Sequence, residues 1–410
     1  LYFRKNIMNK SPLTKRQIIE FFKKQKNIVI KSELVNLQNS HGRLLFEDLK
    51  SKVNLPPFNN SAVDGYALLK KDLNNKYFYC SRRIAAGDKK NIKIKSGEAI
   101  RVFTGARMPS NSSTIVMQEN TLIDKDKIKI LKFPKFGENY RLKGEDIRKN
   151  QKILSKGTKI NHQNINLIAA SGIRKVKVFK KIKIGFFTSG NELRKPTHNL
   201  KNSEINNSNY FALDSLLDQR FVSKKYFGNL KDNLKVVKSN LLRASKKNNI
   251  IITAGGASVG EEDHLIDALS SLGKIFFWRA AIKPGRPIAI GKINSCYFIC
   301  LPGNPVSVQL LYAMLIKPLI EKLSGGFFKL PNSKKIICNF SMKKKTQRME
   351  WLRIIKKTIN NQDVAIKYPK QGSGMISSVS YSDGIIEINE DISEVKKGDI
   401  FNYYDFETLF

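Results

Sequence analysis

Three loops that contain glycine each follow an apolar run in the middle of the chain. They read FFTSGNEL (186–193), ITAGGASVGEEDH (252–264) and CLPGNPVS (300–307). In an open parallel sheet, ligands bind beyond the carboxyl ends of the strands, where loop N–H groups and helix N-termini point outward. One such loop is often only a turn, but three in one domain predict a site for a phosphate-bearing ligand. In the third loop, Asn304 can cap a helix, Pro305 can occupy its first turn, and Gly303 lets the backbone approach an anion.

Acidic residues follow several loop or strand ends, and two of them belong to the glycine loops themselves. The set is Asp64, Asp146, Glu192, Asp232 and Asp263. Acids clustered beside a phosphate site predict a hard divalent cation, with Mg²⁺ bridging the ligand phosphates. The alternative is that each acid only caps a helix or a turn, and the residues alone leave it open.

Two further stretches have the composition of an exposed binding or catalytic loop. In LPPFNNSAVDGYAL (55–68), two prolines and an Asn-Asn-Ser cluster predict a shaped loop that carries Asp64 beside Gly65. In WRAAIKPGRP (278–287), three basic side chains can neutralise an oxyanion. Basic residues are common in this chain, so a plain surface role for that stretch stays open.

The composition limits the class of protein. The 410 residues correspond to about two to four domains. No apolar run reaches the roughly 20 residues of a membrane helix, and no secretory signal is visible, so we expect a soluble, cytoplasmic protein. The four cysteines form no C-x-x-C pair and only four histidines accompany them. We therefore expect no zinc site and no disulfide framework, with Cys296 and Cys300 buried as small apolar side chains.

The net charge of +40, from 74 basic and 34 acidic residues, invites a nucleic-acid interpretation. The lysines are spread over the whole chain in short runs, without an arginine-rich stripe or an aromatic stacking motif. This pattern favours solvated basic faces over a dedicated nucleic-acid surface. We expect weak binding to nucleic acid that is indifferent to sequence and that weakens steeply as the salt concentration rises.

The elements that must position these residues fall into four units. Residues 11–50 and 145–180 read as a discontinuous helical, linking domain, and 51–144 as a small β domain with short alternating runs. Residues 181–326 alternate apolar strands with helices, which predicts a parallel sheet covered on both faces. Residues 327–410 return to short strands and predict a C-terminal β domain. The expected fold class is therefore α/β plus β, multidomain and elongated.

Taken together, these residues resemble the molybdopterin molybdenumtransferase family, MoeA in bacteria and the gephyrin E domain in animals. The matching motifs, in the family's order, are LPPFNNSAVDGYA, TGARMPSNSSTIVMQEN, GEDI, TSGNEL, EINNSN, TAGGASVGEEDH, WRAAIKPGRP, LPGNPVS and QGSG. The resemblance implies an elongated homodimer of four-domain subunits. It also implies an enzyme that takes adenylylated molybdopterin and molybdate, releases AMP and leaves molybdenum on the dithiolene.

The resemblance assigns roles residue by residue. Catalytic positions are Asp64, Thr104, Asp146, Glu192, Asp232, Asp263, Lys283 and Arg353. Cofactor-binding positions are Ser189, Gly190, Gly255, Gly256, Ser258, Arg279, Pro302, Gly303, Asn304, Pro305 and Ser373. The Mg²⁺ ligands are Glu192, Asp232 and Asp263.

The chain departs from the family pattern at several positions. Asn59 replaces a usual acid, Arg279 a frequent lysine, and Ala254 and Ala257 a frequent Ser and Val. The exchange at Arg279 keeps the positive charge but changes the geometry with which the side chain can bind an oxyanion. A molybdopterin adenylyltransferase is the expected upstream partner. The competing hypotheses are a related protein that adenylylates the cofactor, an inactive homologue or scaffold, and a basic nucleic-acid-binding protein.

Overall fold

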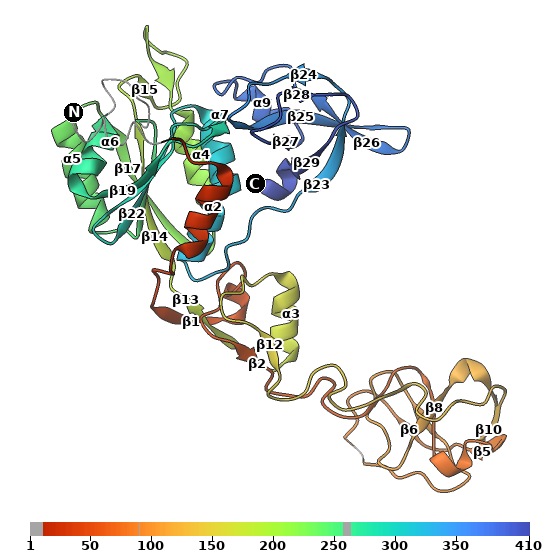
Figure 1. The fold of residues 1–410 in the computed structure, drawn as a ribbon. Coiled ribbons are helices and arrows are strands. Elements are labelled where there is room, and N and C mark those ends of the chain that lie inside the picture. Colours follow the sequence, from red (N-terminus) through yellow and green to blue (C-terminus); the bar gives the residue numbers. More distant parts are fainter. Residues whose placement is uncertain (1–10, 90, 257–263) are drawn as a thin grey trace.

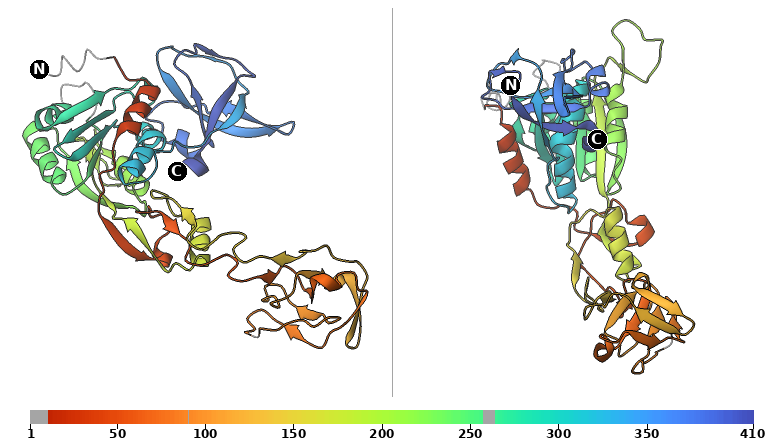
Figure 2. Two further views of the ribbon diagram at one scale, coloured as in Figure 1. Left: turned by 60° about the horizontal axis from the view of Figure 1, so that its bottom comes forward. Right: turned by 90° about the vertical axis from the view of Figure 1, so that its right-hand side faces the viewer.

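The computed structural model describes residues 11–89, 91–256 and 264–410. The molecule is elongated: a central domain and a C-terminal β domain lie together at one end, a linking region follows, and a distal β domain lies at the other end (Figure 1, Figure 2). This confirms the predicted multidomain α/β plus β architecture. Within the described ranges, no helix has both the length and the apolar character that crossing a bilayer requires.

The central domain is built on a six-stranded sheet with the order β17-β14-β18-β22-β21-β19. The strands are, in chain order, β14 (Ile182–Ser189), β17 (Val222–Leu230), β18 (Ile250–Ala254), β19 (Lys274–Trp278), β21 (Ala289–Ile293) and β22 (Cys296–Leu301). Four neighbours, β17, β14, β18 and β22, run parallel. The carboxyl ends of β14, β18 and β22 therefore meet at one edge.

The sheet is not parallel throughout, which differs from the prediction. β21 pairs antiparallel with both β22 and β19. Only Asn294 and Ser295 separate β21 from β22, and Asn294 has a φ of 53°. A two-residue connection with a left-handed asparagine forms a hairpin rather than a crossover. The pair Asn-Ser in GKINSCYF was the sequence signal for it.

Helices cover both faces of the sheet because its strands are apolar on both sides. One face packs against α4 (Ser208–Leu216), α7 (Pro305–Leu311) and α8 (Lys317–Leu323), with Phe186, Ile252 and Leu301 in the shared core. The other packs against α5 (Leu234–Ser245) and α6 (His264–Leu272), with Phe187, Ile251 and Phe298. Alternate residues of each strand face opposite layers, as the strand period of two requires.

Helix α2 (Lys15–Lys24) packs on the central domain, although the sequence grouped it with the linking residues. Thr14 and Gln17 form a capping box at its start. Ile18 and Phe22 are buried in the core of the central sheet, and the Phe21 ring lies 5.3 Å from that of Phe276. The linking region itself contains α3 (His162–Ala170) and two small antiparallel pairs. Those pairs are β1 (Ser32–Asn36) with β13 (Lys175–Phe179), and β2 (Leu49–Lys50) with β12 (Lys152–Leu154).

The C-terminal domain is a closed sheet. Its order is β20-β25-β26-β23-β29-β27, and β25 also pairs with β27, which closes the barrel. The strands are β20 (Ile282–Lys283), β23 (Lys334–Cys338), β25 (Met349–Ile359), β26 (Gln362–Lys367), β27 (Gly384–Ile388) and β29 (Ile400–Asp405). Strand β20 comes from the central part of the chain, so its pairing with β25 ties the two domains together.

The distal domain consists of two packed sheets. The four-stranded sheet contains β4 (Gly65–Leu68), β6 (Arg83–Ile84), β7 (Ile100–Val102) and β8 (Thr114–Met117). The three-stranded sheet contains β5 (Tyr77–Tyr79), β9 (Thr121–Asp124) and β10 (Lys127–Ile130). Tyr66, Leu68 and Val116 of the first sheet share a core with Phe78, Ile128 and Ile130 of the second.

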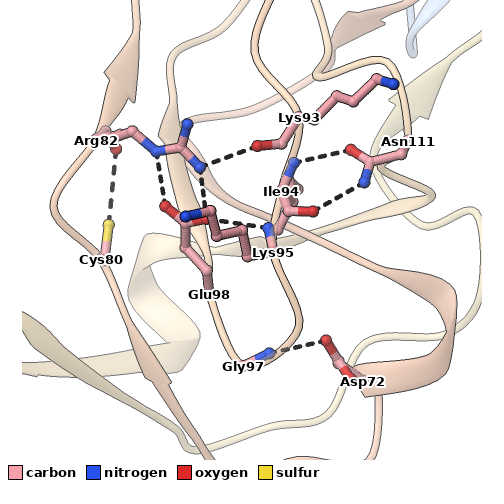
Figure 3. A network of polar contacts seen from close by, with 9 residues as sticks. All are labelled: Asp72, Cys80, Arg82, Lys93, Ile94, Lys95, Gly97, Glu98 and Asn111. Atoms are coloured by element: carbon pink, nitrogen blue, oxygen red, sulfur yellow. Dashed lines mark hydrogen bonds and ion pairs between the residues drawn. The ribbon is translucent and has the colours of Figure 1, made fainter.

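A polar network fixes the segment that precedes β7 (Figure 3). The Arg82 guanidinium donates from Nε to Oε1 of Glu98 at 2.7 Å, and from Nη2 to Oε2 of Glu98 and the Lys93 carbonyl. Asp72 accepts from the Gly97 N–H, and Asn111 makes two hydrogen bonds with the Ile94 backbone. The hydrogen bonds from Arg82 lower the pKa of the Glu98 carboxyl. The ion pair thus adds polar contacts to a loop that Ile94 anchors in the apolar core.

We expect Arg82→Ala to loosen this loop and to destabilise the distal domain by about 1–3 kcal/mol, since a buried carboxylate loses its charged donor. The pKa of Glu98 is depressed in the folded state, so the contribution of the pair is present above the ordinary carboxyl pKa and disappears as pH falls through the folded pKa. The difference between wild type and variant in hydrogen exchange of residues 93–98 should therefore shrink in acid. Arg16→Ala, which removes an exposed helical pair with Glu20, is the control and should change exchange little. Equal protection of wild type and Arg82→Ala at neutral pH would contradict the assignment.

Candidate functional site

A cavity of about 760 Å³ lies at the carboxyl edge of the central sheet. The three glycine loops that follow β14, β18 and β22 form its floor, and residues of the C-terminal domain complete one wall. Its described lining is Ser189, Gly190, Glu192, Leu193, Ile205, Asn206, Ser208, Asn209, Asp232, Gly255, Gly256, Pro287, Pro302, Gly303, Asn304, Pro305, Gly374 and Ile376. The sequence expectation that the three loops face one edge is met by the strand order.

The loops pack backbone against backbone. Gly255 has a φ of +101°, and a Cβ added there would lie 2.5 Å from the Ser189 carbonyl oxygen. A Cβ on Gly303 would lie 3.7 Å from the Gly255 Cα. At Gly255 only glycine can adopt a left-handed backbone conformation so near a neighbouring carbonyl oxygen, because every other residue carries a Cβ. The result is a floor of exposed peptide groups without intervening side chains, which suits the approach of an anion.

A hydrogen-bonded network beneath the first loop holds its carbonyl groups. Thr188 Oγ1 lies 2.8 Å from the Tyr226 hydroxyl, donates to Oδ1 of Asn229 at 3.1 Å and accepts from Nδ2 of Asn207 at 2.9 Å. Asn229 in turn donates to the Gly190 carbonyl at 2.7 Å. Thr188 and Asn207 are buried, Tyr226 is half-buried and Asn229 is exposed; through Asn229 the network holds the turn that carries Glu192 into the cavity.

The third loop is anchored by the C-terminal domain rather than by its own cap. Asn304 occupies the N-cap position of α7, but its side chain makes no capping bond, which corrects the expectation. Its Nδ2 instead donates to the Ser373 hydroxyl at 2.9 Å, and the Val306 N–H at the start of the helix donates to the Ser373 carbonyl at 3.3 Å. Ser373 of the QGSG segment therefore satisfies the helix end and joins the two domains at the cavity.

A second, basic cavity of about 300 Å³ adjoins the first and shares Pro287, Pro302 and Asn304 with it. The remaining lining residues are Ile282, Lys283, Pro284, Gly285, Arg286, Ser307, Arg348, Gln371, Gly372 and Ser373. Three of them are cationic, and one of these, Lys283, forms an ion pair with Glu350 at 3.0 Å. Cations at fixed positions beside a prolyl wall can hold a small oxyanion.

Two of the three expected Mg²⁺ ligands lie in the first cavity. Glu192 is exposed and its carboxylate lies over Gly190, where an added Cβ would be 2.3 Å from Oε2. Asp232 is half-buried and lines the same cavity. Asp263 and Ser258 lie outside the described residues. Within the described ranges no group of three or more acidic, histidine or cysteine side chains is close enough to hold a metal alone.

The comparisons with known proteins agree with this arrangement along the whole chain. Residues 14–172 match the family described as "MoeA N-terminal region (domain I and II)", 185–322 "Probable molybdopterin binding domain" and 335–406 "MoeA C-terminal region (domain IV)". A molybdopterin molybdenumtransferase of Haemophilus influenzae is 31% identical over 382 residues, which cover 92% of this chain and 95% of that protein. The chain belongs to the molybdopterin molybdenumtransferase family.

Two further relatives support the family membership. A molybdopterin molybdenumtransferase of a Nostoc species is 33% identical over 304 residues, 72% of this chain and 70% of that protein. The crystal structure of the molybdopterin biosynthesis MoeA protein of Pyrococcus horikoshii OT3 superposes with a TM-score of 0.83 at 27% identity. The alignment covers 96% of this chain and all of that chain. The predicted resemblance is therefore confirmed.

Three of the residues carried over from the family pattern lie in or beside the distal domain, far from the central cavities in one chain (Figure 1). The Asp64 carboxylate accepts hydrogen bonds at 2.7 Å from both the N–H and the hydroxyl of Thr104, which lower its pKa. Asp146 is exposed near the segment that begins with Leu55. Asn59, where the family usually has an acid, accepts from the Lys143 N–H and donates to the Tyr140 hydroxyl. A single chain does not bring this group to the glycine loops.

Two expected basic residues do not line either cavity in the described part of the chain. Arg353 is 1% exposed, donates to the Ser378 hydroxyl and to the carbonyls of Trp351 and Gly372, and burial lowers its pKa to about 10. It holds the segment that carries Ser373. Arg279 has a φ of 78° and its guanidinium lies 4.7 Å from the Trp278 ring. Arg353 therefore supports the site through Gly372, whereas Arg279 contacts Trp278 and is not among the described lining residues.

Several lining residues had no role in the sequence prediction. Asn209 donates to the Gly303 carbonyl at 2.7 Å and thereby joins α4 to the third loop. Asn206, Ser208 and Asn209 belong to the motif EINNSN, whose polar run before a helix was a usable signal. No sequence signal marked Arg348, because it is one basic residue in a lysine-rich stretch. Only the pairing of β20 with β25 brings it close to Lys283.

Gly255→Ala provides a direct test of the backbone contact. We expect it to lower the free energy of unfolding by more than about 1 kcal/mol and to increase hydrogen exchange in residues 186–193, because its Cβ displaces the Ser189 carbonyl. Gly398→Ala is the matched control: Gly398, in the C-terminal domain, has a φ of +99° but nothing lies within 4 Å of an added Cβ. The control carries the same backbone strain and should leave exchange at 186–193 unchanged. Equal effects of the two variants on that segment would refute the contact.

Proposed function

We propose that this protein is a molybdopterin molybdenumtransferase that inserts molybdenum from molybdate into adenylylated molybdopterin and releases AMP. The observation that carries the proposal is the pair of adjoining cavities, one floored by glycine loops with carboxylates and one lined by cations. The first suits a pyrophosphate ester beside a cation. The second suits a tetrahedral oxyanion. Because the two cavities share Pro287, Pro302 and Asn304, reactants bound in both would lie next to each other.

The chain's own residues account for binding and orientation. The peptide groups around Gly255 and Gly303 approach the phosphates closely, and the apolar lining of Leu193, Ile205 and Ile376 accepts a flat ring system. Lys283, Arg286 and Arg348 stabilise the negative charge of the oxyanion in the second cavity. Glu350 fixes the Lys283 ammonium from the side opposite the solvent, since Glu350 is buried.

The donor set fits Mg²⁺ when the ligand supplies part of the coordination. Glu192 and Asp232 offer carboxylate oxygens in the first cavity, and Mg²⁺ is usually held by one or two carboxylates together with substrate phosphates. When bound, the ion would neutralise charge that develops on the phosphate oxygens as the pyrophosphate bond breaks.

A homodimer completes the site in this proposal. Asp64, Thr104 and Asp146 are presented on a domain separated from the cavities of the same chain, which supports a site shared between two subunits (Figure 1). The reaction also requires a preceding enzyme that adenylylates molybdopterin, so such an enzyme is the proposed upstream partner. The four free cysteines support a reducing compartment, which we propose to be the cytoplasm.

The carboxylates are tested by Glu192→Gln and Asp232→Asn. Each variant should release AMP about 10²-fold more slowly than wild type at saturating molybdate and Mg²⁺, because the variant no longer neutralises charge in the transition state. Thermal melts should remain unchanged, since neither side chain is part of the core. Asp218→Asn, an 81% exposed acid of the same domain, should keep full activity. Turnover of both site variants within a few-fold of wild type would show that these acids serve only the local structure.

The shared site is tested by mixing inactive subunits. Asp64→Asn and Asp232→Asn homodimers should both be inactive. Random exchange of their subunits makes half of the dimers mixed, and each mixed dimer contains one intact site of two. The mixture should therefore recover about a quarter of wild-type activity. Mixing Glu192→Gln with Asp232→Asn should restore nothing, because each mixed site still carries one change. No recovery in the first mixture, with subunit exchange verified by sedimentation of tagged chains, would place each complete site within one subunit.

A further inference from the structure

The three-stranded sheet of the distal domain has one buried and one exposed face. Phe78 and Ile128 point into the domain core. Tyr77 and Tyr79 of β5 alternate with Phe78 and are 61% and 50% exposed. On β10, Lys127 is exposed and Lys129 is half-buried. Strands β5 and β10 lie at the end of the distal domain remote from the central domain (Figure 1), and both tyrosines of this face keep half or more of their surface exposed.

The register places aromatic and basic side chains in two adjacent rows. Tyr79 lies opposite Lys127, which lies opposite Asp124 of β9. Tyr77 lies opposite Lys129, which lies opposite the exposed Leu122. Directly opposed residues of antiparallel strands share a face. The outer face therefore carries two tyrosines along one edge, two lysines in the middle, and one acidic and one apolar residue on the far edge.

We propose that this outer face, formed by Tyr77, Tyr79, Lys127 and Lys129, binds single-stranded nucleic acid. Residues two apart on a strand are about 6.6 Å apart, so the two tyrosyl rings lie at a spacing that lets an extended strand place successive bases on them. Each lysine lies beside one ring, where it reaches the phosphate next to the stacked base. The face thus combines two aromatic stacking surfaces with two cations that the strand register places directly opposite them.

The chemistry of the face favours single-stranded nucleic acid over a duplex or an acidic peptide. Duplex nucleic acid keeps its bases paired and offers no free ring to the tyrosines, so it should gain only the electrostatic part of the binding. An acidic peptide would match the charge of the lysines but carries no regular series of flat rings. The face belongs to a different sheet from β4, the strand that follows Asp64, and uses none of the residues assigned to molybdenum insertion.

The experiment measures the affinity of the full-length protein for a fluorescein-labelled 12-residue oligothymidylate by fluorescence anisotropy at several salt concentrations. Tyr77→Ala with Tyr79→Ala should weaken binding at least about tenfold while leaving its salt dependence unchanged, because only stacking is removed. Lys127→Gln with Lys129→Gln should weaken binding and lower the salt slope by about 0.7 for each phosphate that the variant no longer neutralises. Neither pair should alter AMP release, which also shows that the variants remain folded.

Matched controls separate this face from the general charge of the protein. Tyr381→Ala removes a 74% exposed tyrosine of the C-terminal domain, and Lys246→Gln with Lys247→Gln removes two exposed lysines of the central domain. Both should bind the oligonucleotide within about twofold of wild type. A labelled duplex of the same length should bind more weakly than the single strand and be insensitive to the tyrosine changes.

Two outcomes would overturn the proposal. If the tyrosine pair binds like wild type, or if the lysine controls weaken binding as much as Lys127→Gln with Lys129→Gln, binding is a property of the scattered charge. If polyglutamate displaces the oligonucleotide equally well and its own binding depends on both tyrosines, the face is a docking surface for an acidic protein instead.

Discussion

The backbone contact between the glycine loops at the carboxyl edge of the central sheet is the constraint on which the site depends. Gly255 lies so close to the Ser189 carbonyl, in a left-handed conformation, that no side chain fits between the first two loops. Gly303 approaches the same glycine from the third loop. The parallel order β14-β18-β22 makes this meeting possible, because it aligns the three strand ends at one edge.

Contacts of the third loop join the central domain to the C-terminal domain at the cavity. The third loop holds its position through Asn209 of α4 on one side and Ser373 of the C-terminal domain on the other. Strand β20 then carries Lys283 into the C-terminal barrel, which places the basic cavity directly beside the glycine loops. Arg353 serves this arrangement from within the barrel, since its buried guanidinium holds the carbonyl of Gly372 next to Ser373. A charged residue can thus matter to a site that it does not line.

Charge has different roles at the two ends of the molecule. In the central cavities a few carboxylates and cations are held in fixed positions, so local geometry outweighs the net charge of +40. In the distal domain the Arg82–Glu98 pair is structural, and Asp64 is held by Thr104 with its carboxylate presented outward. The many remaining lysines contribute mainly a long-range positive field, which salt screens.

The sequence by itself determined the fold class and the family, and it predicted the glycine loops and the acids Glu192 and Asp232 that line the central cavity. Apolar runs ending in glycine loops imply strand ends at one edge, and that inference needs only local patterns and the rule for parallel sheets. Only the tertiary structure decided several other features. These are the hairpin at Asn294, the packing of α2 on the central sheet, the anchoring of Asn304 by Ser373, and the positions of Arg348 and Arg353. Each depends on contacts between residues distant in the chain. The paired tyrosines of the distal sheet show the same limit: alternation in KYFYC predicts a strand, but only the strand register with DKIKI shows that its tyrosines and lysines share one exposed face.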